Sequence, residues 1–244
     1  MAGKPGFASL RAEYAQLWSS MVVTRTKVPA ADAICQRIVS NRRKYEAVQQ
    51  ATNVPWFVVA VIHSLESGLN FGTHLHNGDP LTRRTTHVPA GRPAEGNPPF
   101  TWEYSAADAL RMKAFDKNTD WSPERIAYLL ESYNGWGYRM YHPGTLSPYL
   151  WSFSNHYRSG KYVADGKWDQ AAVSQQCGAM VLLKRLEAAG VISFGSQTPV
   201  PPARPAPQPG HDAPAPETAG DPSQPATGFL AALFELLFGW LRRK

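Results

Sequence analysis

Glu66 stands at the end of a long apolar stretch, where a carboxyl group acquires unusual chemistry. Residues 54–67, VPWFVVAVIHSLES, are apolar on nearly every side, so we expect a buried helix there. The negative end of the helix dipole and the apolar surroundings both disfavour an ionised carboxylate and raise its pKa. Glu66 is therefore a candidate general acid. The plain alternative is a solvated glutamate in a last helical turn, so other residues have to support the assignment.

Asp79 is the candidate for a second carboxylate, thirteen residues after Glu66. Cleavage of a glycosidic bond usually needs an acid together with a second carboxylate or a positioned water on the other side of the sugar. Asp79 lies in the turn sequence HNGDPLTRRTTH, where Thr85, Thr86 and His87 could hold a water or contact the substrate. An Asn-Gly-Asp-Pro turn also suits an aspartate that bonds only its own backbone, so both roles stay open.

Aromatic and amide side chains gather after another expected helix, in LLESYNGWGYRMY. Sugars stack on aromatic planes through their apolar faces and bond to amides through their polar edges. We therefore predict a sugar-binding wall, made of Tyr133, Asn134, Trp136 and Tyr138. A later run, SPYLWSFSNHYRSGKYV, adds further aromatic side chains that either extend this wall or pack between loops.

Two short motifs resemble those of known cell-wall enzymes. The pair Glu66-Ser67 at the end of a buried helix, followed by SYNG at 132–135 after another helix, is similar to motifs of soluble lytic transglycosylases and goose-type lysozymes. Those motifs are Glu-Ser and Ala-Tyr-Asn-Ala/Gly. The spacing of Asp79 and Thr85 resembles the Asp and Thr of phage-type lysozymes. Together the matches resemble the lysozyme-like superfamily.

The resemblance, over about residues 30–190, implies a helical domain in which Glu66 on the central helix is the catalytic acid. It implies peptidoglycan as substrate, cleaved between N-acetylmuramic acid and N-acetylglucosamine. Tyr133 and Asn134 would then form the substrate wall, and Asp79 would be the assisting carboxylate. A phage or prophage endolysin would fit this description.

Other functions stay open at this point. The product is either a hydrolysed sugar, as from a muramidase, or an anhydro-sugar, as from a lytic transglycosylase. Chitinase-like hydrolysis is a further possibility, since related helical folds accept polymers of N-acetylglucosamine. In a non-catalytic alternative the protein binds the wall or permeabilises a membrane, and Glu66 is a bystander.

The histidines and arginines around residues 63–92 do not form any other recognisable metal or catalytic motif. Four histidines lie in this region, but no paired cysteines and no clear third ligand accompany them. We therefore expect neither a metal nor another cofactor. The four histidines are His63, His74, His76 and His87. Three arginines beside the expected site could attract the carboxylates of peptidoglycan. They are Arg83, Arg84 and Arg92.

The pattern of helix signals predicts the elements that must position these residues. Helices are expected at 8–22, 31–52, 54–67, 105–116, 123–133 and 168–189. Asn53 and Ser105 are expected helix caps, and Gly68 a helix stop. The long irregular segment 68–104 contains LTRRTTHV, residues 81–88, which suits a small hairpin. We expect a mainly α, α+β lysozyme-like fold, with a helical domain, a small irregular β-hairpin lobe and a cleft between them.

Composition divides the chain into three parts. Residues 1–195 are expected to form the catalytic domain, and the Pro- and Ala-rich segment 196–227 a disordered linker. The linker is followed by residues 228–244, GFLAALFELLFGWLRRK. Their pattern favours an amphipathic helix that is too short to span a bilayer. We expect it to contact a membrane or lipopolysaccharide, the alternatives being docking on the domain or self-association.

The net charge of +6 favours an anionic partner. We expect no nucleic-acid binding, because the basic residues are scattered along the chain. Cys35 and Cys177 lie in apolar helical patterns and are expected to be buried, inert thiols. The amino end lacks an apolar stretch of signal-peptide length, so we expect synthesis in the cytoplasm and action at the wall after release.

Overall fold

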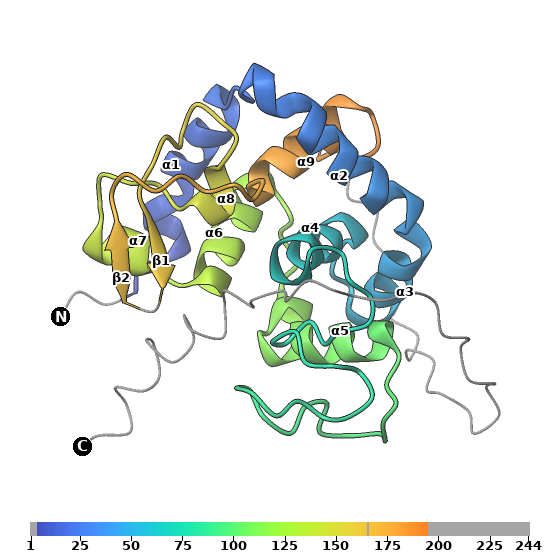
Figure 1. Ribbon diagram of the computed structural model, residues 1–244. Coiled ribbons are helices and arrows are strands. Elements are labelled where there is room, and N and C mark those ends of the chain that lie inside the picture. The colour runs from blue at the N-terminus through green and yellow to red at the C-terminus, as the bar shows by residue number, and fades with distance from the viewer. Residues whose placement is uncertain (1–3, 165, 195–244) are drawn as a thin grey trace.

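The computed structural model describes residues 4–164 and 166–194, and its described part is mainly helical with one small antiparallel sheet (Figure 1). The helices are α1 Phe7–Ser20, α2 Val28–Ser40, α3 Arg42–Thr52, α4 Trp56–Ser67, α5 Trp102–Met112, α6 Pro123–Asn134, α7 Gly137–Tyr141, α8 Pro148–Trp151 and α9 Ala179–Ala188, with 3-10 turns η1 Arg25–Lys27 and η2 Phe115–Lys117. The strands are β1 Lys161–Ala164 and β2 Lys167–Asp169. This confirms the predicted fold class, while the predicted linker and tail helix lie outside the described residues.

The central element is α4, as its apolar sequence predicts. Every residue from Trp56 to His63, and Leu65 after them, is buried. Helices α2, α3 and α9 pack against α4, and Figure 1 shows it in the middle of the molecule. A helix buried on all sides is held in place by apolar packing rather than by its own propensity. The carboxyl end of α4 therefore has a fixed position.

Two groups of helices lie on either side of α4 in Figure 1. On one side α1 packs against α6, near α7 and the β1–β2 hairpin. On the other side α3 packs against α5, and the long segment 68–101 lies beside α5. Helix α9 closes the core by packing against α2, α4, α6 and α8. An ion pair between Arg185 Nε and Asp32 Oδ1, 2.6 Å apart, also joins α9 to α2.

The helix bounds correct several predictions. The single helix expected over 31–52 is two helices, because the chain turns at Asn41. Asn53 caps the end of α3 in a left-handed conformation (φ 61°), whereas the sequence pattern predicts it as the cap at the start of the next helix. Thr101, and not Ser105, caps α5 by accepting a hydrogen bond from the Tyr104 amide at 3.3 Å. The predicted stop at Gly68, with φ 59°, is confirmed.

The hairpin was predicted in the wrong place. Residues 81–88 contain no strand, and the sheet is formed instead by β1 and β2, with Tyr162 opposite Trp168. The backbone amides of Thr86 and His87 donate to the Asp79 carboxylate, so they are not available for strand pairing. Strand β2 occupies the start of the range 168–189, over which a single helix is predicted. The observed helix in that range, α9, begins only at Ala179.

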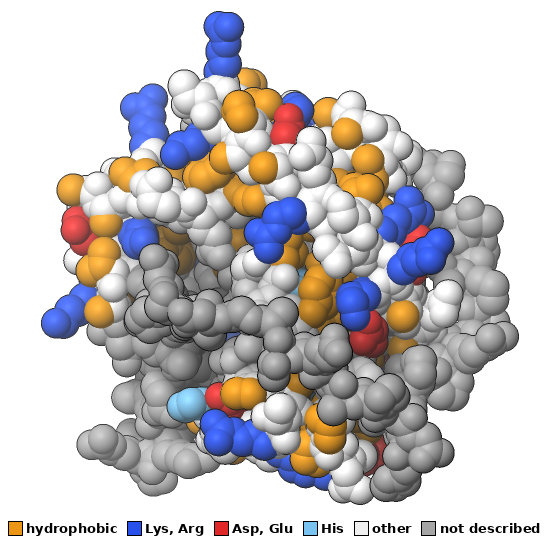
Figure 2. Space-filling view, turned by 45° about the vertical axis from the view of Figure 1, so that its right-hand side comes forward, with side chains coloured by type: hydrophobic (Ala, Val, Ile, Leu, Met, Phe, Trp, Pro, Cys, Tyr) orange, Lys and Arg blue, Asp and Glu red, His pale blue; other side chains and the backbone are white. Residues whose placement is uncertain are grey.

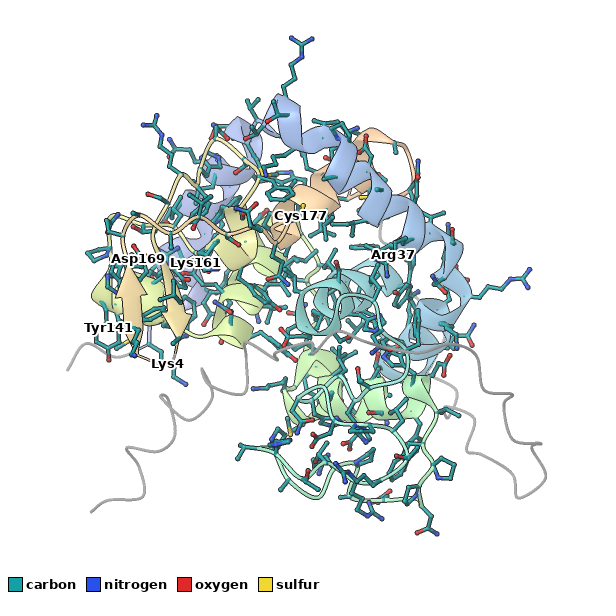
Figure 3. All side chains as sticks on the ribbon, in the orientation of Figure 1. Lys4, Arg37, Tyr141, Lys161, Asp169 and Cys177 are labelled. Carbon is teal, nitrogen blue, oxygen red and sulfur yellow. The ribbon has the colours of Figure 1, made fainter. Side chains whose placement is uncertain are left out.

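The described surface carries positive charge in many places. Figure 2 shows Lys and Arg side chains distributed over the visible face of the described residues, with acidic side chains among them. Within the described ranges, no helix has the length and apolar character needed to cross a membrane. Cys35 and Cys177 are buried free thiols, as predicted, and Figure 3 shows Cys177 beside α9 in the interior.

Candidate active site

The carboxyl end of α4 is held by donors from distant parts of the chain. The last carbonyls of a helix have no partner within the helix. Here the side-chain amide of Gln176 donates to the Leu65 carbonyl at 2.7 Å, and the Gly68 amide donates to the Ser64 carbonyl at 3.2 Å. Arg37, which comes from α2 (Figure 3), donates to the Gly68 carbonyl at 3.1 Å. These bonds fix the backbone on both sides of Glu66.

The Glu66 carboxyl is bound by a buried tyrosine. The Tyr149 hydroxyl on α8 donates to Glu66 Oε1 at 2.8 Å. Tyr149 is only 6% exposed, so its ring has little freedom to move away. Glu66 is itself partly buried. The carboxyl group therefore has one oxygen fixed by a phenol, which orients the other oxygen.

Burial raises the pKa of Glu66 to about 7. Desolvation is the largest cause, since an ionised carboxylate loses its water without an adequate replacement. The hydrogen bond from Tyr149 and the positive charge of Lys113 act in the opposite direction and lower the pKa. Because burial outweighs both, a substantial part of the Glu66 carboxyl is protonated at neutral pH. This is the state that a general acid requires.

Tyr133 and Lys113 complete the surroundings of Glu66. The Lys113 ammonium lies over the Tyr133 ring, 5.3 Å from its centroid. Burial, and then the negative charge of Glu66, raise the pKa of the Tyr133 phenol well above its usual value. The edge of Phe115 packs on Tyr133 with ring centroids 5.9 Å apart. Of the predicted wall residues, Tyr133 is therefore the one that lies beside Glu66.

Asn134 connects two of the helices that surround Glu66. It is buried at the end of α6, and its side-chain amide donates to the Ser147 hydroxyl at 3.4 Å. Ser147 precedes α8, and its carbonyl accepts the Trp151 amide at 3.0 Å. The amide thus links the end of α6 to the start of α8. Those two helices carry Tyr133 and Tyr149, the aromatic residues beside Glu66.

Asp79 lies in a separate hydrogen-bonded group within the segment 68–101. Its Oδ2 accepts the amides of Thr86 at 2.7 Å and His87 at 3.0 Å, and its Oδ1 accepts His87 Nδ1 at 2.6 Å. Burial opposes ionisation of Asp79, but the bonds from His87 and Thr86 outweigh it and lower its pKa to about 2. Asp79 is thus ionised and bonded to the local amides of Thr86 and His87 and to the His87 ring.

Thr85 is buried and bonded within the same segment. Its hydroxyl donates to the Pro89 carbonyl at 2.5 Å and accepts the Arg92 amide at 2.8 Å. The backbone amide of Thr85 donates in return to the Arg92 carbonyl at 2.8 Å. These bonds give Thr85 a role in closing the loop around residues 85–92.

Trp136 and Tyr138 are interior residues, 4% and 8% exposed. The Trp136 ring packs on Tyr128 with centroids 5.4 Å apart. Tyr138 packs against Tyr162 and Trp168 of the hairpin at 5.5 and 5.7 Å. These contacts pack Trp136 against α6 and Tyr138 against the β1–β2 hairpin.

The four histidines each have a separate partner. The His63 ring contacts the Tyr45 hydroxyl, His74 the Ser105 hydroxyl, His76 the Asp108 carboxylate and His87 the Asp79 carboxylate. Burial lowers the pKa of His63 to about 4, so it is neutral. In the described part of the chain, no three His, Cys, Asp or Glu side chains are grouped as metal ligands.

Comparison of the chain with models of protein families, with curated proteins and with solved structures gives no match. The site is therefore defined by its own geometry. Tyr149 lies in the aromatic run 147–163, for which the sequence leaves wall and loop packing both open, and Lys113 is not among the predicted site residues. Tyr149 is 83 residues from Glu66 along the chain. No spacing signal in the sequence joins it or Lys113 to the end of α4.

Proposed function

We propose that the protein is a peptidoglycan glycosidase, a muramidase that cleaves the bond between N-acetylmuramic acid and N-acetylglucosamine. Glu66 is its general acid. The observation that carries the proposal is the carboxyl of Glu66, partly buried, bonded to Tyr149 and with its pKa raised to about 7. A carboxyl group whose pKa is raised by burial between aromatic side chains is typical of a catalytic acid.

The same surroundings support the proton transfer. Protonated Glu66 donates to the glycosidic oxygen as the bond to the leaving sugar breaks. The carboxylate that remains keeps the hydrogen bond from Tyr149 and feels the positive charge of Lys113. Both interactions favour the ionised form, so they offset part of the desolvation cost after the proton has left. Tyr133, whose ring lies under the Lys113 ammonium, is proposed as a contact of the sugar beside the reacting carboxyl.

Asp79 is proposed as the assisting carboxylate on the resemblance to the Asp of phage-type lysozymes, and the bonds from Thr86 and His87 keep it ionised while Glu66 is protonated. Two carboxyl groups with separated pKa values suit the division into acid and stabiliser or base. If Asp79 assists a water, the product is a hydrolysed sugar. A lytic transglycosylase would release an anhydro-sugar without that water, and product analysis separates the two.

The test is clearance of purified peptidoglycan by the wild type and by Glu66→Gln, with mass analysis of the released sugars. Gln keeps an acceptor for Tyr149 but cannot supply the proton, so clearance should fall at least about 100-fold. Glu46→Gln is the matched control and should clear normally, since Glu46 is a half-buried glutamate on α3 paired with Arg42. Undiminished clearance by folded Glu66→Gln would contradict the proposal and favour the non-catalytic alternative.

We also propose that residues 228–244 bring the enzyme to a membrane or to lipopolysaccharide. The support is their sequence, an apolar run ending in Arg242, Arg243 and Lys244. A protein lacking 228–244 should lose binding to anionic vesicles and keep clearance of purified wall. Unchanged vesicle binding would contradict this part of the proposal.

A further inference from the structure

One structural unit from the later part of the described chain holds the end of α4. The unit consists of α8 and the segment 170–178, which joins β2 to α9. Tyr149 of α8 donates its hydroxyl to Glu66 Oε1 at 2.8 Å. Gln176 of the segment donates its side-chain amide to the Leu65 carbonyl at 2.7 Å. Two adjacent residues of α4, one of them the proposed acid, are thus held by this unit.

Helix α8 and the segment 170–178 are bonded to each other. The hydroxyl of Ser152, directly after α8, donates to the Ser174 carbonyl at 3.3 Å. The Gly178 amide donates to the Ser152 carbonyl at 3.0 Å. A Cβ atom at position 178 would overlap the Leu150 carbonyl, so glycine is what lets the two backbones approach this closely. The segment therefore has a fixed position relative to α8.

The Leu65 carbonyl depends on Gln176 for its hydrogen bond. Carbonyl groups in the last turn of a helix lack a partner within the helix. The Leu69 amide, which would reach the Leu65 carbonyl in a longer helix, donates to the His63 carbonyl at 3.4 Å. Leu65 is only 4% exposed, so little of it is open to water. Among the described residues, the Gln176 amide is therefore the donor to this carbonyl.

A donor at the Leu65 carbonyl acts on Glu66 in two ways. It fixes the last turn of α4, from which the Glu66 side chain extends to Tyr149. The partial positive charge of the donor also offsets part of the negative end of the helix dipole, which disfavours an ionised carboxylate. The Gln176 amide therefore affects both the orientation of the acid and its affinity for a proton.

We infer that Gln176 is a positioning residue for Glu66, which holds the last turn of α4 where the carboxyl group meets the Tyr149 hydroxyl. This inference rests on the proposed glycosidase function, in which Glu66 donates the proton. Gln176 acts through the Leu65 carbonyl and needs no contact with the sugar. Its role differs from that of Tyr149, which binds the carboxyl group itself.

Four titratable or charged side chains act at the end of α4, from α8, from α6, from the end of α5 and from α2. They are Tyr149, Tyr133, Lys113 and Arg37, in that order. A substitution of Gln176 leaves all four in place. A shift in the titration of Glu66 is then due to the altered donor at the Leu65 carbonyl.

The test follows the Glu66 carboxyl directly, by ¹³C NMR titration of the full chain. Gln176→Met keeps the length of the side chain but donates no hydrogen bond, so Glu66 should titrate about half a pH unit higher. Gln176→Lys supplies a charged donor, so the titration should move to lower pH instead. Gln175→Met is the matched control at the neighbouring exposed glutamine, whose amide donates to the Val173 carbonyl at 3.4 Å, and it should titrate as wild type.

Turnover of glycan strands gives a second readout at pH 5, where Glu66 is protonated. Gln176→Met should lower kcat about 10-fold and leave KM within about twofold of wild type, because the last turn of α4 orients the acid and does not bind the sugar. Gln176→Lys should restore most of kcat, since it again supplies a donor to the Leu65 carbonyl. Wild-type kcat in folded Gln176→Met would overturn the inference.

The NMR titration separates this inference from the proposed function, because it needs no turnover. Shifts of opposite sign in Gln176→Met and Gln176→Lys support the inference even if wild type cleaves no glycan, a result that would refute the glycosidase. An unchanged titration of Glu66 in both variants, with only thermal stability reduced, would show a purely structural contact and overturn it. If Gln176→Met does not fold, Gln176→Lys decides, since a titration that stays in place or moves to higher pH overturns the inference.

Discussion

At the level of single residues, burial and hydrogen bonding separate the pKa values of two carboxyl groups. Glu66 is partly buried and has one phenol as hydrogen-bond donor, and its pKa is raised to about 7. Asp79 receives bonds from Thr86 and His87, and its pKa is lowered to about 2. Burial raises the pKa of both carboxyl groups: at Glu66 it outweighs the bond from Tyr149, whereas at Asp79 the bonds from His87 and Thr86 outweigh it.

Tyr149→Phe tests the hydrogen bond to Glu66. The hydroxyl lowers the pKa of Glu66, so its removal should move the alkaline limb of the pH–rate profile to higher pH. Loss of orientation should reduce kcat/KM on the acidic plateau by about 10-fold. Activity on peptidoglycan from pH 4 to 9 measures both effects. A limb that moves to lower pH, or does not move, would contradict the assignment.

Asp79→Asn tests the hydrogen bonds within 68–101. An amide cannot accept from all the donors that the carboxylate serves, so we expect a loss of about 1–3 kcal/mol in unfolding free energy at pH 7. Asp79 has a lowered pKa, so its ionised form stabilises the wild type above about pH 4, and this contribution is lost as pH falls toward 2. In urea unfolding, the difference in unfolding free energy between variant and wild type should narrow as pH falls from about 4 to about 2. A gap independent of pH would refute this.

At the level of elements, a buried charge network joins α1 to α6. The Tyr14 hydroxyl donates to Glu131 Oε2, and Arg139 Nη2 donates to the same oxygen at 3.0 Å. Arg139 also bonds Glu13 Oε2 at 3.0 Å. Glu131 is on the helix whose end carries Tyr133. The network therefore fixes α6, and with it one wall of the candidate site.

Tyr14→Phe should destabilise the protein by about 1–3 kcal/mol, because the buried Glu131 carboxylate loses a donor. Tyr128→Phe is the matched control. Its hydroxyl donates to a neutral acceptor, the Pro5 carbonyl, at 3.2 Å, and less than about 1 kcal/mol should be lost. Thermal unfolding of both variants gives the comparison. Equal effects would show that the charge of Glu131 does not matter.

The elements that sequence predicts well are those with strong local signals. Helix α4 is apolar all round, and α6 starts at Pro123 after the cap residue Ser122. The predicted ends of both helices therefore lie within two residues of the observed ends. The turn at Asn41 has no Gly or Pro to mark it, so it depends on tertiary packing that a local pattern does not contain. The hairpin has a local signal that the prediction passed over, an Asp-Gly pair in the sequence between the two strands, in which Tyr162 lies opposite Trp168.

The candidate site divides in the same way. Glu66 follows from the end of an apolar helix, and Tyr133 from an aromatic cluster after a second helix. Tyr149 reaches Glu66 only because α8 packs against α6 and α9. The hydrogen bond between the two residues therefore becomes visible only in the folded chain.

At the level of the whole molecule, the described core extends to Phe194. Its ring packs edge-on against Trp18 at 5.3 Å and Phe57 at 5.8 Å, which joins the end of the domain to α1 and α4. Ile192 is buried beside it. A domain boundary placed after residue 195 keeps these contacts, whereas one placed at 190 removes them.

Two truncated proteins test this boundary. Residues 1–195 should unfold with nearly the stability of the full chain and clear purified peptidoglycan equally well. Residues 1–190 should lose about 3–5 kcal/mol, since the apolar surface left on Trp18 and Phe57 has no cover. Urea unfolding measures both. Equal stability of the two truncated proteins would refute a boundary at 195.

The most direct test of the central claim, that Glu66 is a general acid with a raised pKa, is the pH dependence of kcat/KM on purified glycan strands, with Glu66→Gln as the blank. Wild-type activity should fall about tenfold per pH unit above about pH 7, because proton donation needs the protonated carboxyl. Glu66→Gln should show no cleavage at any pH. Activity that is flat from pH 5 to 9, or cleavage by Glu66→Gln at the wild-type rate, would contradict the claim.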